Sequence, residues 1–196
     1  CNERALGSRW FDLSDFDDWD DIEEELKKQG IPANYNVEGF AECAEITTFL
    51  ALLSVIDNPE TDIELLSLLL SPIFAFTPED LAKIRINKRS GNIYQAIVYS
   101  AKNGNLKCDE FLKKIEKFML MSVSYSLPKL ISKLLTETNY INLVTVMNDG
   151  LRRRNNLLLL TEYAKTFSEN NFASIGSFVK YIRKQSEMGL STASAS

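Results

Sequence analysis

The chain contains no histidine among its 196 residues. Histidine is the commonest general base near neutral pH, so its absence excludes Ser-His-Asp and Cys-His catalysis and His-based metal sites. Glycine is scarce, and neither GxxxxGK[ST] nor GxGxxG occurs, so the chain has no phosphate-binding loop of its own. No apolar run approaches the roughly 20 residues that cross a bilayer, and no charged-then-apolar leader opens the chain. These absences predict a soluble chain that is neither exported nor catalytic.

Cysteine is also rare, with Cys1, Cys43 and Cys108 far apart and odd in number. This spacing gives neither a disulfide framework nor the paired ligands of a zinc site. We therefore expect reduced cysteines, a cytoplasmic location and no metal site. Cys43 and Cys108 are interpreted as buried side chains.

Charge is distributed unevenly along the chain, although the net charge is only -5. Residues 1–64 hold 4 Lys/Arg and 17 Asp/Glu, a balance of -13, whereas residues 65–196 hold 18 and 10, a balance of +8. Nine of the acids lie between Asp12 and Glu25, but that segment lacks the central glycine of an EF-hand loop, which favours a solvated helix start. The basic remainder suits a phosphate-facing surface, with an ordinary solvated face as the alternative.

Apolar residues recur mostly at steps of three and four, which is the helical period. The sequence therefore predicts an all-α fold, an irregular multi-helix bundle of about 8–10 helices with at most a short extended segment near residues 31–36. Acidic residues, Pro78 and the cap Thr77 mark one clear helix start. The expected helices cover residues 17–29, 44–56, 62–70, a segment from 77 onward, 92–102, 108–121, 127–137, 151–167 and 172–185.

The best candidates for contact with DNA are basic residues on two of the last predicted helices. Arg152, Arg153 and Arg154 open one helix, where guanidinium groups and free backbone N–H groups converge on anions. One of the three must point inward, where pairing with a carboxylate is the alternative to DNA. The last helix adds Lys180, Arg183 and Lys184 opposite its apolar face, with Tyr181 expected in the core or at its rim.

Three stretches of the sequence form recognisable motifs. The first runs from Gly30-Ile31-Pro32 through Ile56-Asp57-Asn58-Pro59 to Ser71-Pro72-Ile73-Phe74, the second is Glu137–Tyr140 and the third is Gly150–Leu157. Together they resemble the region between helicase motifs IV and V of the AddA (RexA) type of UvrD-like superfamily 1 helicases, in which the second stretch is similar to the family's ETGY and the third to its GGxxRRANL.

The chain departs from the family pattern at three positions. Leu70 replaces a usual arginine, Asn139 a glycine, and Asp149 the first glycine of a pair. The missing arginine puts in doubt any function that the family assigns to that position.

The resemblance implies that residues 17–188 are a helical accessory subdomain, of the 2B type, inserted in the second motor domain of an ATP-dependent helicase/exonuclease of double-strand-break repair. Residues 1–16 are then the flank of the motor or an added leader, and residues 189–196 a linker or an added tail. In that family ATP and magnesium bind elsewhere, so this chain alone would hold no cofactor and would lack ATPase, helicase and nuclease activity.

The expected partners are duplex DNA, the motor domains of the same polypeptide and a partner nuclease subunit, with no membrane. One role is to guide duplex DNA and regulate the motor. The alternative is a module that docks on the motor or the partner subunit without touching DNA. A third interpretation, outside the family, is a helical adaptor unrelated to helicases.

Overall fold

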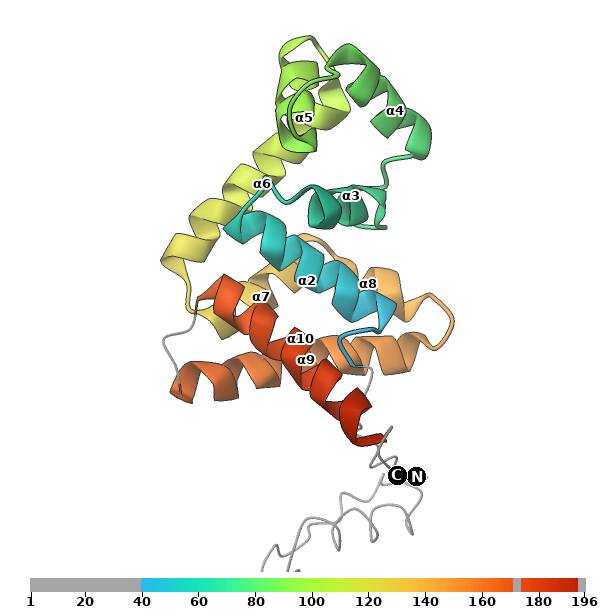
Figure 1. Ribbon diagram of the computed structural model, residues 1–196. Helices are drawn as coiled ribbons and strands as arrows, with labels where there is room; N and C mark the ends of the chain where they lie inside the picture. Colours follow the sequence, from blue (N-terminus) through green and yellow to red (C-terminus); the bar gives the residue numbers. More distant parts are fainter. Residues whose placement is uncertain (1–39, 171–173, 194–196) are drawn as a thin grey trace, which may run out of the picture. The chain divides into compact units, whose positions relative to one another are not determined.

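The computed structural model describes residues 40–170 and 174–193 (Figure 1). The expected first helix, the extended segment at 31–36 and the acidic cluster lie outside these residues. The described residues form nine helices and no strand, which confirms the all-α prediction. The helices are α2 (Ala44–Asp57), α3 (Asp62–Leu70), α4 (Pro78–Asn87), α5 (Ile93–Lys102), α6 (Leu106–Ser124), α7 (Leu127–Glu137), α8 (Tyr140–Thr145), α9 (Gly150–Asn170) and α10 (Ile175–Ala193).

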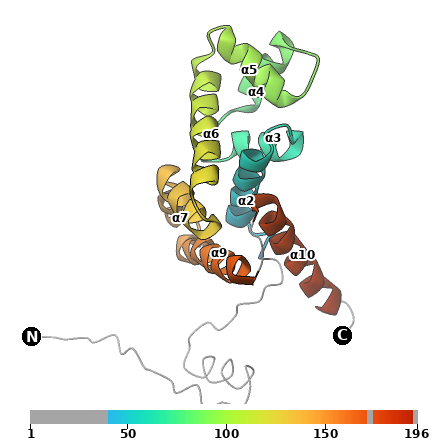
Figure 2. The same ribbon diagram turned by 90° about the vertical axis from the view of Figure 1, so that its left-hand side faces the viewer.

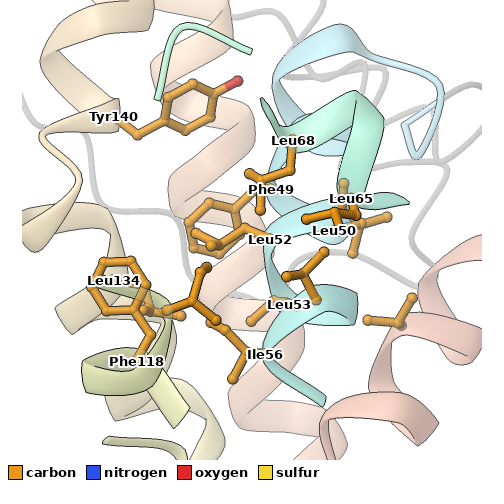
Figure 3. Close-up of a cluster of buried hydrophobic side chains, with 14 of the residues drawn as sticks. Phe49, Leu50, Leu52, Leu53, Ile56, Leu65, Leu68, Phe118, Leu134 and Tyr140 are labelled. Atoms are coloured by element: carbon orange, nitrogen blue, oxygen red, sulfur yellow. The ribbon is translucent and has the colours of Figure 1, made fainter. Parts of the chain in front are cut away.

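Helix α2 is the centre of the core. Its sequence is apolar almost all round, which is typical of a helix covered on every side. It packs against α3, α6, α9 and α10, and Phe49, Leu52 and Leu53 are wholly buried. Figure 3 shows these side chains meeting Leu134 of α7 and Tyr140 of α8, so residues far apart in the sequence share one core.

Most of the other helices form two groups joined by α6, and α10 packs on α2. In the first group α5 contacts both α3 and α4, whereas in the second group α7, α8 and α9 all contact one another. The long helix α6 packs on α5 near its start and on α7 near its end, as Figure 2 shows. The candidate DNA-contacting residues all lie in α9 and α10.

Several helix bounds differ from those that the periodicity predicts. Helix α6 begins at Leu106 rather than Cys108, because the side chain of Asn105 accepts a hydrogen bond from the Cys108 N–H at 3.1 Å and caps the helix earlier. The short helix α8 was not predicted. It begins after Asn139, whose left-handed backbone (φ 54°) ends α7 and redirects the chain.

The last two helices also extend beyond their expected ends. Helix α9 spans Gly150–Asn170, where residues 151–167 were expected. Helix α10 begins at Ile175 and continues to Ala193, into the segment interpreted as a linker or tail.

Candidate nucleic-acid interface

The corner between α8 and α9 depends on a glycine. A Cβ atom on Gly150 would lie 2.0 Å from the backbone oxygen of Thr145, so only glycine allows α9 to begin directly against the end of α8. Asp149, just before it, adopts a left-handed backbone with φ 57°. Because this tight corner fixes the start of α9, it also fixes the directions in which the three arginine side chains that follow project from the helix.

Arg153 points into the bundle and joins α9 to α2. Its Nη1 donates to Oε2 of Glu45 at 2.6 Å, and its Nε donates to the backbone oxygen of Asn148 at 2.9 Å. Nδ2 of Asn156, one turn further along α9, donates to the other Glu45 oxygen at 2.7 Å. We call Glu45, Arg153 and Asn156 the α2–α9 clamp.

The clamp satisfies a carboxylate that is removed from solvent. Glu45 lies in the first turn of α2, where the helix dipole favours negative charge, and its side chain is only 1% exposed. A buried carboxylate is tolerated when it is ion-paired and both oxygens accept hydrogen bonds, which is the arrangement here. The clamp therefore serves to fix the start of α9 on the start of α2.

Neither Cys43 nor Cys108 is an activated thiol. Burial is the largest cause that raises the pKa of Cys43, with the charge of Glu45 adding to it, and burial raises the pKa of Cys108 to about 11. Cys108 is buried as expected, whereas Cys43 is half-buried beside the clamp. Both thiols therefore stay protonated near neutral pH, as packing residues do.

Arg152 and Arg154 remain on the surface. Successive residues of an α-helix are rotated by about 100°, so three consecutive arginines cannot share one direction. With Arg153 engaged by Glu45, its neighbours are exposed, and Arg152 lies 3.5 Å from the exposed carboxylate of Asp149. Two of the three candidate arginines are thus accessible to an external anion.

The second group of candidate cations lies on α10. Lys180 and Lys184 are exposed and one turn apart, whereas Arg183 makes an exposed ion pair with Glu64 of α3 at 3.3 Å. The opposite face of α10 is buried through Phe178 and Ile182. The structure thus places the six candidates on two helices, with Arg153 turned inward and the other five on the surface.

Tyr181 lies at the rim of the core, as expected. Its ring centroid is 5.1 Å from that of Phe167 in α9, and the side chain is half-buried. It is therefore held in a ring contact within the bundle.

Sequence reasoning did not single out Glu45. A lone acid near a helix start normally predicts a solvated side chain, so nothing in the sequence indicated that this carboxylate is buried. Its burial depends on Arg153, which is 108 positions away.

Within the described residues, no group of three or more His, Cys, Asp or Glu side chains is placed to hold a metal ion.

Comparison with known proteins identifies the family of the chain. Residues 14–193 match the UvrD-like helicase C-terminal domain. The chain belongs to this family. This UvrD-like domain is 32% identical over 168 residues to the ATP-dependent helicase/nuclease A-subunit of Lactobacillus delbrueckii subsp. bulgaricus, an alignment that covers 84% of the chain and 14% of the relative.

Two further relatives carry the same name. The protein from Clostridium novyi is 32% identical over 171 residues, and that from Ruminiclostridium cellulolyticum is 35% identical over 164 residues. Each alignment covers 82% of this chain and 14% or 13% of the relative, respectively. The UvrD-like domain therefore spans about one seventh of the length of the curated relatives that it matches.

Among the helices that the structure describes, none combines the length and the apolar character needed to span a membrane.

Proposed function

We propose that this UvrD-like domain is the accessory, 2B-type subdomain of an ATP-dependent helicase/nuclease that acts in double-strand-break repair. Its role is to guide duplex DNA and to regulate the motor, without catalysis of its own. The similarity to helicase/nuclease relatives over most of the chain supports this proposal. ATP and magnesium would bind to other parts of the parent polypeptide, because this sequence has no phosphate-binding loop.

The observation that supports contact with DNA is that one arginine of the triplet is bonded inside the bundle while the other two are exposed. Arg153 is fixed internally by Glu45, and this fixes the helix turn from which Arg152 and Arg154 project into solvent. Cations held on a rigid helix start, next to its positive dipole end, suit phosphate oxygens. Lys180 and Lys184 on α10 supply a second set of exposed positive charges.

Binding to duplex DNA as a function of salt tests the proposal. The chain is titrated against a fluorescein-labelled duplex, and the slope of log affinity against log salt concentration is measured for each variant. Arg152→Gln/Arg154→Gln and Lys180→Gln/Lys184→Gln should weaken binding and flatten that slope by about 0.9 for each phosphate that is no longer neutralised. The matched control Lys102→Gln/Lys133→Gln removes two other exposed lysines and should change neither quantity as much.

The result that would contradict this proposal is an absence of duplex binding at low salt. It would favour the alternative role, a module that docks on the motor domains or on a partner nuclease subunit without touching DNA. ATP turnover by the purified chain above the blank would contradict the assignment to a non-catalytic subdomain.

A further inference from the structure

Helix α3 carries apolar side chains on its exposed face as well as on its buried face. Its core-facing side chains are wholly buried: Leu65, Leu68 and Leu69. On the opposite face Ile63 is 81% exposed, Leu70 is 48% exposed, and the half-buried Leu66 lies between them. Ile63 and Leu70 are seven positions apart, which is close to two full turns, so they project from the same side of the helix. We call Ile63, Leu66 and Leu70 the α3 stripe.

Both ends of α3 are fixed to the rest of the bundle. At its start, Oδ1 of Asp62 accepts a hydrogen bond from the Ile93 N–H at 2.9 Å. Near its end, the backbone oxygen of Leu69 accepts one from the Phe76 N–H at 2.9 Å. A preorganised surface loses less conformational entropy on binding, so the α3 stripe is suited to contact with another molecule.

The charge around the α3 stripe is negative. The sequence from Phe40 to Ala82 contains eight Asp/Glu and no Lys/Arg. Asp57 and Glu60 are exposed just before α3, while Glu64 beside the stripe pairs with Arg183 of α10 at 3.3 Å. Exposed carboxylates repel the phosphates of a nucleic acid and attract cationic groups. The occupant that complements this surface is therefore apolar in the middle and basic at its edges.

The dimensions of the stripe suit one helix. Ile63 and Leu70 lie about 10 Å apart along the helix axis, the rise of two turns. Helices that bind to protein surfaces use apolar anchors with this same spacing, at positions i, i+3 or i+4 and i+7. An interface between domains of one chain buries about 600–1,500 Å², more than two turns of a helix supply. A single helix of a partner protein therefore fits better than a whole domain.

The exposed apolar residues of α6 lie in a different charge environment. Leu120 and Val123 are 67% and 89% exposed, but the hollow at Leu120 is also lined by Lys113 and Lys117, with Glu116 beside them. A basic helix is repelled by those lysines. The α6 surface thus offers the same apolar chemistry without the negative charge, which makes it a matched control.

We propose that the α3 stripe is a docking site for a helix of a partner protein, with apolar residues of that helix on Ile63 and Leu70 and lysines or arginines beside Asp57 and Glu60. The inference goes beyond the proposed function and does not depend on it, because the candidate DNA contacts lie on α9 and α10. A domain with both surfaces could hold DNA on one and a protein on the other.

The test uses three fluorescein-labelled synthetic helices as probes. The first has a leucine stripe edged with lysines, the second has the same stripe edged with glutamates, and the third keeps the lysines but has serines in place of the leucines. We expect the leucine–lysine helix to bind the chain about tenfold more tightly than either of the others, as partial burial of two aliphatic side chains implies. Fluorescence anisotropy measures the three affinities.

Two double variants locate the binding site. Ile63→Ser/Leu70→Ser should weaken binding of the leucine–lysine helix about tenfold, whereas the control Leu120→Ser/Val123→Ser should leave it unchanged within about twofold. Circular dichroism checks that both variants are folded. Binding of Ile63→Ser/Leu70→Ser to duplex DNA should equal that of the unmodified chain, because its arginines and lysines remain.

A charge reversal tests the edge of the stripe separately from its apolar centre. Glu60→Lys should weaken binding of the leucine–lysine helix about threefold and strengthen binding of the leucine–glutamate helix by a similar factor. Damage to the fold would weaken both helices, so opposite changes can come only from the charge at this edge.

Three results overturn the inference. The first is equal binding of the leucine–lysine helix and its two controls. The second is a loss of binding in the α6 variant instead of the α3 variant. The third is self-association of the chain in sedimentation velocity that Ile63→Ser/Leu70→Ser abolishes, since a second copy would then occupy the stripe. Failure of the chain to bind duplex DNA, with peptide binding through α3 intact, would contradict the proposed function alone.

Discussion

Two of the ion pairs that join different helices of this domain differ in burial. The α2–α9 clamp pairs Arg153 with Glu45, whose side chains are 24% and 1% exposed. On the other side of the core, Nζ of Lys107 at the start of α6 lies 2.7 Å from Oδ2 of Asp80 and donates to the backbone oxygen of Ala75 at 2.8 Å. We call Lys107 and Asp80 the α4–α6 clamp, and their side chains are 41% and 32% exposed, respectively.

The difference in burial predicts a difference in how much each clamp matters. When one partner of a buried pair is removed, the other is left as a desolvated charge, whereas an exposed partner is rehydrated at once. The fold should therefore depend strongly on the α2–α9 clamp and weakly on the α4–α6 clamp. The corner that presents Arg152 and Arg154 is built on the stronger of the two.

The largest expected effect comes from breaking the buried clamp. Arg153→Met leaves the Glu45 carboxylate buried with Asn156 as its one remaining side-chain hydrogen-bond donor among the described residues, and should lower the free energy of unfolding by about 3–5 kcal/mol. The adjacent Arg154→Met removes an exposed arginine of the same helix and should change it by less than about 0.5 kcal/mol. Urea unfolding followed by circular dichroism measures both. Equal effects would show that the buried ion pair contributes no more to the free energy of unfolding than the exposed Arg154 does.

A smaller effect is expected from the glycine that supports the same clamp. Gly150→Ala forces a Cβ against the Thr145 carbonyl and should reduce stability by about 1–3 kcal/mol. Gly104→Ala is the comparison, because its Cβ meets nothing within 4 Å and only the positive φ of 90° opposes alanine. Gly150→Ala should therefore have the larger effect.

A double-mutant cycle then relates the glycine to the clamp. If the close approach at Gly150 serves to bring Arg153 to Glu45, Gly150→Ala should have a smaller effect in the Arg153→Met background than alone. Strictly additive effects would show that the corner and the clamp are independent.

The two clamps also show what the sequence could predict. On the α4–α6 side only the helix start that carries Asp80 was predicted, from Thr77 and Pro78, and the pairing of Asp80 with Lys107, 27 positions away, was not. The structure has a capping box at this start, with Thr77 and Asp80 exchanging hydrogen bonds at 3.0 and 3.2 Å. Such signals operate over three or four residues and need no knowledge of the tertiary structure.

The α2–α9 clamp had no comparable local signal. The sequence indicated that one arginine of the triplet must turn inward, but not which one or toward which carboxylate. That depends on how α2 and α9 pack, over a separation of 108 residues. The six-residue helix α8 was missed for a related reason, since it is too short to display a helical period. Helix class and most bounds were therefore accessible from the sequence, while the internal partner of Arg153 was not.

The smallest expected effect concerns the exposed clamp and depends on pH. The hydrogen bond from Lys107 is the largest cause that holds the pKa of Asp80 below its ordinary 3.8, and the Thr77 N–H adds to it. A carboxylate with a lowered pKa in the folded state stabilises the fold above its unfolded pKa, and this contribution is lost as the pH falls through the folded value. Asp80→Asn should therefore reduce stability by less than about 1 kcal/mol at pH 7.

The difference between Asp80→Asn and the unmodified chain should then shrink as the pH is lowered from about 4 toward 2, because protonation removes the same charge from the unmodified chain. Urea midpoints of both chains across this range measure it, on the condition that both remain folded at the lowest pH used. Arg153→Met provides the reference, since its effect at pH 7 should exceed that of Asp80→Asn several-fold. A difference for Asp80→Asn that matched Arg153→Met at pH 7 would mean that burial does not separate the two clamps, and that the α4–α6 side of the core depends on its ion pair as strongly as the corner that presents Arg152 and Arg154.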